Sequence, residues 1–156
     1  MKKIITLTGH KDCKKDLLAE DLAKNSAVGV IPPYTDKKLP ISLTMDYIEV
    51  SKEKLDELIE KNEVLSETMI DGNRYVYFTS QLEYDYNILI VDDYALVDVK
   101  EYYPDEEIYS IKVYHKNQKD SDRVGVYMYD HEFDKVFHYD SDDFSELEWE
   151  IEEYFE

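Results

Sequence analysis

Residues 9–16 (GHKDCKKD) place a glycine, a short polar stretch and paired lysines in the order that a phosphate-binding loop uses. That motif reads G-x-x-x-x-G-K-[ST]: loop amides hold the phosphates, the lysine reaches them, and the hydroxyl residue holds magnesium. Gly9 and Lys15 occupy the positions of the first glycine and of the lysine. Lys14 replaces the second glycine, and Asp16 replaces the hydroxyl residue. The stretch therefore predicts the remnant of a phosphate site with an altered magnesium position.

Asp92 and the aspartate after it follow the most apolar stretch of the chain, 87–91 (NILIV). Open α/β sheets place their ligands outside the carboxyl ends of the strands, so these carboxylates predict one edge of a site. No metal site is expected. His131, Asp134 and His138 carry suitable donor atoms, but the two histidines fall on opposite faces of an extended segment.

The charge of the chain is strongly negative and unevenly distributed. The formal net charge is −19, yet residues 1–38 alone carry +3, so the remainder carries −22. Such a field favours a basic protein partner and argues against direct binding of nucleic acid or of a membrane. We expect an acidic partner face on the last helix, comprising Glu146, Glu148, Glu150, Glu152, Glu153 and Glu156.

The length and composition predict one folded domain in a reducing compartment. The chain has 156 residues, of which 43% are hydrophobic, enough for one core. Its single cysteine excludes an internal disulfide, and no run approaches the roughly 20 apolar residues of a membrane span. The expected location is the cytoplasm, or the host cytoplasm if the protein is viral.

Apolar periodicity alternates between strands and helices, which predicts an α/β fold whose parallel sheet is flanked by helices. Expected strands cover 4–8, 28–31, 45–50, 64–70, 74–79, 87–91, 108–114, 124–128 and 133–139. Expected helices cover 17–25, 52–61 after a Ser51 cap, 95–102, and a last one starting near 141–143. The Asp71-Gly72 pair predicts a hairpin, and 34–43 is expected to be a loop. A single domain 1–156 would then have a core of 1–33 and 80–156 and an inserted subdomain of 34–79.

Several stretches, in this order and spacing, resemble guanylate kinase, a P-loop nucleoside monophosphate kinase. The matching text is D-Y-I-E-V at 46–50, the helix from Ser51, E-V-L-S-E at 63–67, G-N-R-Y at 72–75, the strand ending at Asp92, V-K-E-Y-Y-P-D at 99–105, and the last strand and helix over 133–144. The resemblance covers nearly the whole chain. It implies a P-loop kinase-like parallel sheet with a small antiparallel insert of the nucleotide-monophosphate-binding type and a reduced lid at 115–130.

The same resemblance implies the remnant of a nucleotide-monophosphate site, formed by Lys37, Lys38, Tyr47, Tyr75 and Asp92. Tyr47 and Tyr75 fall on family tyrosines that contact the substrate phosphate, and Asp92 falls on an aspartate near the base. Lys37 and Lys38 stand where the family has its T-R-x-x-R phosphate clamp. Lysine lacks the bidentate fork of arginine, so this clamp would be weakened.

Departures from the family cluster on its chemistry. Ser66 aligns with the glutamate that reads guanine, and the shortened lid keeps one arginine, Arg123. The whole chain contains only Arg74 and Arg123. Because phosphoryl transfer depends on positive charge and magnesium around the phosphates, these losses indicate a degenerate member.

Three functions stay open from the sequence. The leading one is a catalytically degenerate guanylate kinase-like protein acting as an acidic protein-binding module or inhibitor, in its sharper form a viral protein that mimics DNA. The second is weak nucleotide binding without efficient transfer. The third is an active, divergent nucleoside monophosphate kinase of the GMP type. Only the third requires ATP and magnesium as cofactors.

Overall fold

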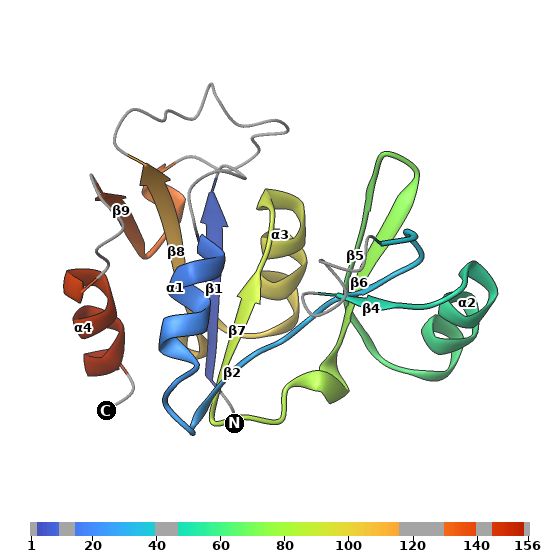
Figure 1. Cartoon of the computed structure of the whole chain (residues 1–156), viewed down its shortest axis with the longest axis horizontal. Helices are drawn as coiled ribbons and strands as arrows, with labels where there is room; N and C mark the ends of the chain where they lie inside the picture. The colour runs from blue at the N-terminus through green and yellow to red at the C-terminus, as the bar shows by residue number, and fades with distance from the viewer. Residues whose placement is uncertain (1–2, 10–14, 40–46, 116–129, 140–144, 155–156) are drawn as a thin grey trace.

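The larger sheet has five parallel strands in the order β2-β7-β1-β8-β9. The computed structural model describes residues 3–9, 15–39, 47–115, 130–139 and 145–154 (Figure 1). The strands are β1 (Lys3–Gly9), β2 (Val28–Val30), β7 (Tyr86–Ile90), β8 (Ile108–His115) and β9 (Lys135–Tyr139). Residues 4–8 of β1 are all buried, as a central parallel strand covered on both faces requires. The predicted parallel α/β sheet is confirmed.

Helices cover both faces of this sheet (Figure 1). On one face, α1 (Lys15–Leu22) and α4 (Ser145–Tyr154) bury apolar side chains in the core beneath the sheet. On the other face, α3 (Asp93–Tyr102) does the same. The first core includes Ile5, Leu7, Leu18, Leu22, Leu147 and Ile151, and the second includes Ile4, Leu89, Leu96 and Val99. Successive residues of β1 thus serve different cores, because strand side chains alternate between faces.

A second sheet has four strands in the order β4-β3-β6-β5. They are β3 (Tyr34–Thr35), β4 (Ile48–Glu49), β5 (Val64–Ile70) and β6 (Asn73–Phe78). β3 pairs antiparallel with β6 but parallel with β4, so the insert sheet is mixed and not wholly antiparallel. The expectation of a loop over 34–43 was wrong at β3, whose hydrogen-bonding partners lie far away in the sequence.

Two local predictions in the second sheet are confirmed. Helix α2 spans Lys52–Lys61, and the Ser51 side chain accepts a hydrogen bond from the backbone N–H of Lys54 at 3.1 Å. The β5–β6 hairpin turns through Asp71 (φ 51°) and Gly72 (φ 81°). Positive φ at both central residues belongs to the turn type that fits strand twist, and it favours this Asp-Gly pair.

The second sheet packs against the first through α3. Leu65 of β5 and Tyr77 of β6 join the core that contains Leu89 and Leu96. The carboxyl end of β7 therefore faces the insert, and this junction positions the candidate site. Most of the expected lid (116–129), the expected strand at 124–128 and the start of the last helix lie outside the described residues. In the part of the chain that the structure describes, no helix combines the length and apolarity needed to cross a membrane.

Candidate functional site

Gly9, the first residue of the predicted phosphate loop, lies at the carboxyl end of β1. Gly9 is the last residue of that strand and lies opposite Val113 of β8, and α1 begins at Lys15. The expected strand and helix are therefore present on either side of residues 10–14, which lie outside the described residues. Lys14 falls outside the described residues, as do the side chains of Lys15 and Asp16, so their roles at a phosphate remain predictions.

A polar layer lies beneath the end of β1. Thr8 is paired in register with Lys112 of β8, and both are buried. The Lys112 ammonium lies 5.4 Å from the ring centroid of Tyr114 and 5.1 Å from that of Phe133. Among the described residues, the Thr8 hydroxyl has no hydrogen-bond partner, which is unusual for a buried polar group. Sequence reasoning missed Lys112, because its strand otherwise reads as an ordinary apolar run.

Between the two sheets, a pocket of about 170 Å³ opens beside the carboxyl end of β7. Three residues of the predicted nucleotide-monophosphate site, Tyr47, Tyr75 and Asp92, line this pocket. The Tyr47 and Tyr75 rings meet edge to face with their centroids 5.9 Å apart. Lys37 and Lys38 are exposed and are not among the lining residues. The structure thus brings together three of the five predicted residues.

Hydrogen bonds hold two of the lining residues, Asp92 and Tyr77, in place. Asp92 caps α3, because its Oδ1 accepts from the backbone N–H of Ala95 at 2.8 Å. Tyr77 donates its hydroxyl to the Ile90 carbonyl at 2.9 Å. Burial raises the pKa of Tyr77, and the neighbouring Tyr47 and Asp92 add to this effect, against the opposing effect of the Ile90 hydrogen bond. Tyr77 therefore stays protonated throughout the physiological range.

The side of the pocket formed by β5 differs from what base recognition in the family needs. Ser66, at the position of the guanine-reading glutamate, is buried and donates its hydroxyl to the Asp98 carboxylate at 3.0 Å. Glu67 is exposed and is not among the lining residues. The Asp98 carboxylate therefore lies behind Ser66 and does not line the pocket. The Ser66 hydroxyl lines the pocket where the family has a glutamate carboxylate.

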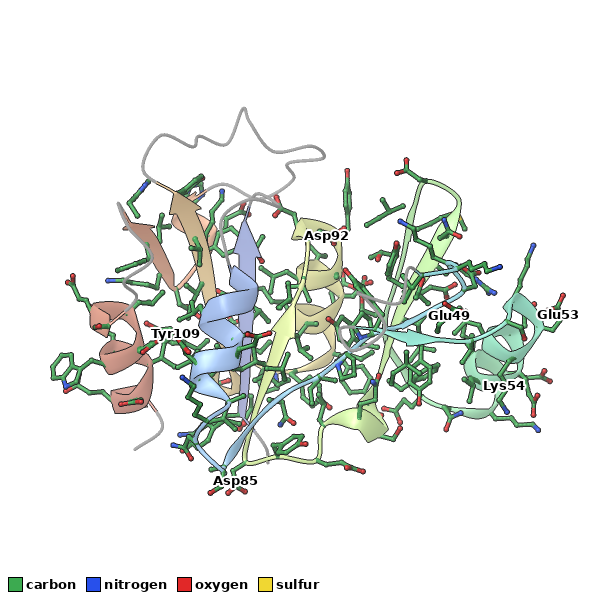
Figure 2. All side chains as sticks on the ribbon, in the orientation of Figure 1. Glu49, Glu53, Lys54, Asp85, Asp92 and Tyr109 are labelled. Carbon is green, nitrogen blue, oxygen red and sulfur yellow. The ribbon has the colours of Figure 1, made fainter. Side chains whose placement is uncertain are left out.

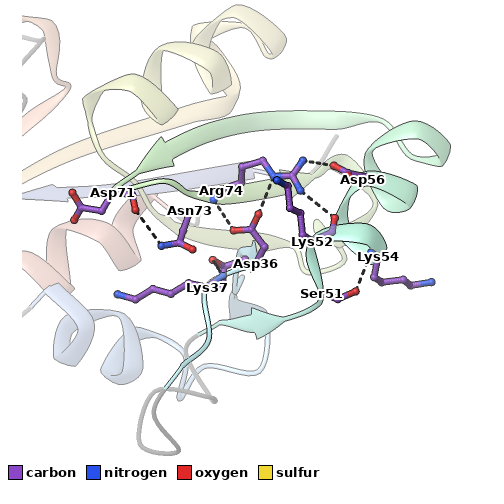
Figure 3. Close-up of polar contacts among 10 residues, drawn as sticks. Asp36, Lys37, Ser51, Lys52, Lys54, Asp56, Asp71, Asn73 and Arg74 are labelled. Atoms are coloured by element: carbon purple, nitrogen blue, oxygen red, sulfur yellow. Dashed lines mark hydrogen bonds and ion pairs between the residues drawn. The ribbon is translucent and has the colours of Figure 1, made fainter.

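Where the phosphate clamp was expected, the structure has a network of ion pairs and hydrogen bonds within the protein (Figure 3). Asp36, between the predicted Thr and Lys positions of that clamp, accepts from the Nε of Arg74 at 3.0 Å and from its backbone N–H at 2.9 Å. The Nη1 of Arg74 reaches Asp56 at 2.6 Å, and its Nη2 donates to the Lys52 carbonyl at 3.2 Å. The network joins the residue after β3 to β6 and α2, and all three nitrogen atoms of the guanidinium donate hydrogen bonds in it.

Both buried partners of this network stay ionised. The side chains of Arg74 and Asp36 are only 13% and 8% exposed. Burial by itself raises the pKa of Asp36 and lowers that of Arg74. The hydrogen bonds and mutual attraction outweigh burial, so the pKa of Asp36 lies below and that of Arg74 above its ordinary value. Arg74 serves the structure of the insert and is not positioned for a phosphate.

The glutamates of α4 do not share one environment. Glu146, Glu152 and Glu153 are exposed, whereas Glu150 forms an ion pair with Lys135 of β9 at 2.9 Å. Glu148 is half-buried, and burial raises its pKa, with Asp21 of α1 contributing further. Glu156 lies outside the described residues. Among the described residues, the exposed acidic surface of α4 therefore comprises only Glu146, Glu152 and Glu153 of the six predicted glutamates.

Trp149 lies on the outer side of α4 and was missed by the sequence reasoning. Its side chain is 61% exposed, although Leu147 and Ile151 beside it in the sequence are fully buried. A helical wheel contains the signal: 147 and 151 are four residues apart, and 149 falls on the opposite side of the helix. The exposed tryptophan therefore stands among the exposed glutamates.

Comparison with known proteins supports the fold. No family model and no curated protein matches the chain. Among solved structures, the chain is similar to guanylate kinase from Anaplasma phagocytophilum, with a TM-score of 0.71 and 15% sequence identity, covering 99% of this chain and 84% of that chain. At this identity the likeness shows the fold alone. The chain has a guanylate kinase-like fold, which confirms the resemblance in the sequence.

Proposed function

From this fold, we propose that the chain is a catalytically degenerate guanylate kinase-like protein that acts as an acidic protein-binding module. Its working face is the outer side of α4, defined by Glu146, Trp149, Glu152 and Glu153, and its partner is a basic protein. A DNA-binding protein inhibited by mimicry of phosphates is one member of that class. The observation that carries the proposal is the exposure of Trp149.

Trp149 has the properties of an interface anchor. Tryptophan is enriched at energetic hot spots of protein interfaces, and an exposed indole forgoes the burial that otherwise stabilises it. On a helix, residues three and four positions away are neighbours, so Glu146, Glu152 and Glu153 flank the ring. The indole face attracts a lysine or arginine, and the carboxylates around it add charge complementarity. This combination suits a basic side chain from a partner.

The fate of the positive charges supports the loss of phosphoryl transfer. That reaction needs cations converging on the transferred group. Arg74 is held by Asp36 and Asp56, and Lys37 and Lys38 are exposed and do not line the pocket. Nucleotide binding without transfer has in its favour the pocket that gathers Tyr47, Tyr75 and Asp92, but the described lining supplies no cation for a phosphate.

The binding proposal can be tested with the fluorescence of Trp149, which is the sole tryptophan of the chain. Titration with an octa-arginine peptide should shift or quench its emission, because the guanidinium groups approach the indole. The apparent affinity should fall at least tenfold between about 50 and 300 mM salt, since exposed charges are screened within about 10 Å or less. Unchanged emission at saturating peptide would contradict the proposal.

A matched pair of variants separates this face from the general charge of the molecule. Glu146→Gln with Glu153→Gln removes two carboxylates from α4, and Asp105→Asn with Glu106→Gln removes two exposed ones from η3 (Asp105–Glu107). We expect about fivefold weaker peptide binding for the first pair and little change for the second. Equal weakening by both pairs would show non-specific attraction and would refute a defined face. In a pull-down from cell lysate, the wild type should retain a basic partner that elutes with salt. Trp149→Ala should not retain this partner.

Retained kinase activity is the competing function and needs its own measurement. A coupled assay with GMP, ATP and magnesium should show no turnover, and none of these ligands should raise the melting temperature. If ATP stabilises the wild type, and Lys15→Ala abolishes both that stabilisation and turnover, the proposed loss of chemistry is wrong.

A further inference from the structure

Three of the residues that line the pocket between the sheets, Ser66, Tyr77 and Asp92, present hydrogen-bond acceptors to it. Ser66 and Tyr77 have already committed their hydroxyl protons, to the Asp98 carboxylate and the Ile90 carbonyl. Their oxygens therefore present lone pairs to a ligand. Asp92 is a carboxylate, which only accepts, and its Oδ2 has no partner among the described residues. A ligand that matches these three groups must donate hydrogen bonds to them.

The charge around the pocket has the same preference. Its lining within the described residues contains a carboxylate and no lysine or arginine. Asp98 adds a second carboxylate directly behind Ser66. A phosphate monoester carries negative charge, so it would meet like charge here without a lysine or arginine in the described lining to compensate it. The net charge of −19 extends this preference for cations to longer range.

The walls of the pocket are aromatic, and two of the lining residues are almost fully buried. Tyr47, Tyr75 and Tyr77 all line it, and Ser66 and Tyr77 are only 2% and 4% exposed. Cations bind favourably when they lie within about 6 Å of an aromatic ring centroid. The pocket has a volume of about 170 Å³, enough for a group the size of one amino-acid side chain. The tyrosine rings, together with the acceptor oxygens of Asp92, Ser66 and Tyr77, therefore favour a flat cation that carries many hydrogen-bond donors.

We propose that this pocket binds an alkylguanidinium group, which stacks against the tyrosines and donates to Asp92, Ser66 and Tyr77. A guanidinium is planar, always charged and donor-only, and it pairs with a carboxylate through two parallel hydrogen bonds. The pocket lies at the junction of α3 with the insert, on other elements than the α4 face, so this site is independent of the function proposed above. The group belongs either to an arginine side chain of another protein or to a free small molecule.

The test compares small probes by heteronuclear NMR of the full chain. Butylguanidinium, its neutral isostere butylurea, and GMP are titrated separately. We expect butylguanidinium to shift the amide signals of Ser66, Tyr75 and Asp92, with butylurea binding at least tenfold more weakly, because it lacks the charge. GMP should leave these signals unchanged. A blocked Gly-Arg-Gly peptide distinguishes the two sources: it binds if the pocket takes an arginine side chain and fails if the pocket admits only a free small guanidine.

The decisive variant is Asp92→Asn. Asparagine caps a helix as well as aspartate does, so α3 should be retained while the charge is lost. The control is Asp85→Asn, an exposed aspartate at the opposite end of β7 (Figure 2). We expect Asp92→Asn to weaken butylguanidinium binding about tenfold and Asp85→Asn to leave it unchanged. A second variant, Tyr75→Leu, tests the aromatic wall and should also weaken binding.

Three outcomes would overturn the proposal. GMP could bind with shifts at these amides while butylguanidinium does not. Butylurea could bind as tightly as butylguanidinium, which would exclude a role for the charge. Asp85→Asn could weaken binding as much as Asp92→Asn, which would reduce the effect to the general acidity of the chain. Far-UV circular dichroism of each variant establishes that a loss of binding is not a loss of fold.

Discussion

Arg74 forms its contacts with Asp36, Asp56 and the Lys52 carbonyl through a planar fork that lysine does not have. Arg74→Lys keeps the charge but cannot reach two carboxylates and a carbonyl at once. We expect it to lower the free energy of unfolding by about 1–3 kcal/mol, the range for charged hydrogen bonds left unmade in a largely buried site. Urea denaturation measures this. Lys24→Gln is the control: its ion pair with Asp21 is 80% and 44% exposed, so its loss should change little.

Asp36 makes the same network sensitive to acid. Burial raises the pKa of its carboxyl, but the Arg74 hydrogen bonds and charge outweigh burial, and the net pKa lies below the ordinary 3.8. A carboxyl whose folded pKa is lowered stabilises the fold above its unfolded pKa, and that contribution is lost as pH falls through the folded value. The stability difference between wild type and Asp36→Asn should therefore be full at pH 5 and above and shrink steadily below pH 3.8.

Denaturation of both proteins across this pH range checks the prediction, with Asp105→Asn as an exposed control whose difference from wild type should stay small at every pH. A difference between wild type and Asp36→Asn that is constant down to pH 2 would show that the Arg74 network does not lower the pKa of Asp36.

At the scale of single elements, the sequence predicts what local interactions decide. The helix over Lys52–Lys61 was predicted at its observed bounds, because Ser51 caps it and Leu55 marks its buried side. The Asp71-Gly72 turn was likewise predicted, because positive φ limits the choice of residues there. β3 was not predicted: Tyr34 and Thr35 become a strand only by pairing with Val76 and Tyr75.

The candidate site also contains contacts that no local sequence pattern predicts. That Tyr47, Tyr75 and Asp92 would lie together was implied by a family resemblance, and no local pattern in the chain contains it. The Arg74–Asp36 network joins residues 38 positions apart. In the sequence, Asp36 shows only that an acidic residue stands within the expected clamp, and not that it pairs with Arg74. The acceptor character of Ser66 and Tyr77 depends on where each hydroxyl donates, which only the fold determines.

For the molecule as a whole, the net charge of −19 opposes the compact state through mutual repulsion of carboxylates. Glu148 is a local instance: burial and then Asp21 raise its pKa, so its ionised form destabilises the fold. A carboxyl with a raised folded pKa costs stability when ionised, and this cost disappears as it is protonated. As the pH falls through the raised folded pKa of Glu148 towards the ordinary 4.5, the melting temperature should thus rise, until the loss of the Asp36 contribution reverses the trend at lower pH.

Added sodium chloride should act in the same direction at pH 8, because it screens the repulsion between surface carboxylates. A gain of 1 kcal/mol corresponds to a rise of about 2–4 °C in melting temperature for a chain of this size. Glu148→Gln removes the local contribution, so it should melt higher than wild type at pH 8, and its advantage should vanish near pH 4. A melting temperature that falls with salt, or that is highest at pH 8, would mean that paired charges stabilise this molecule more than its net charge destabilises it.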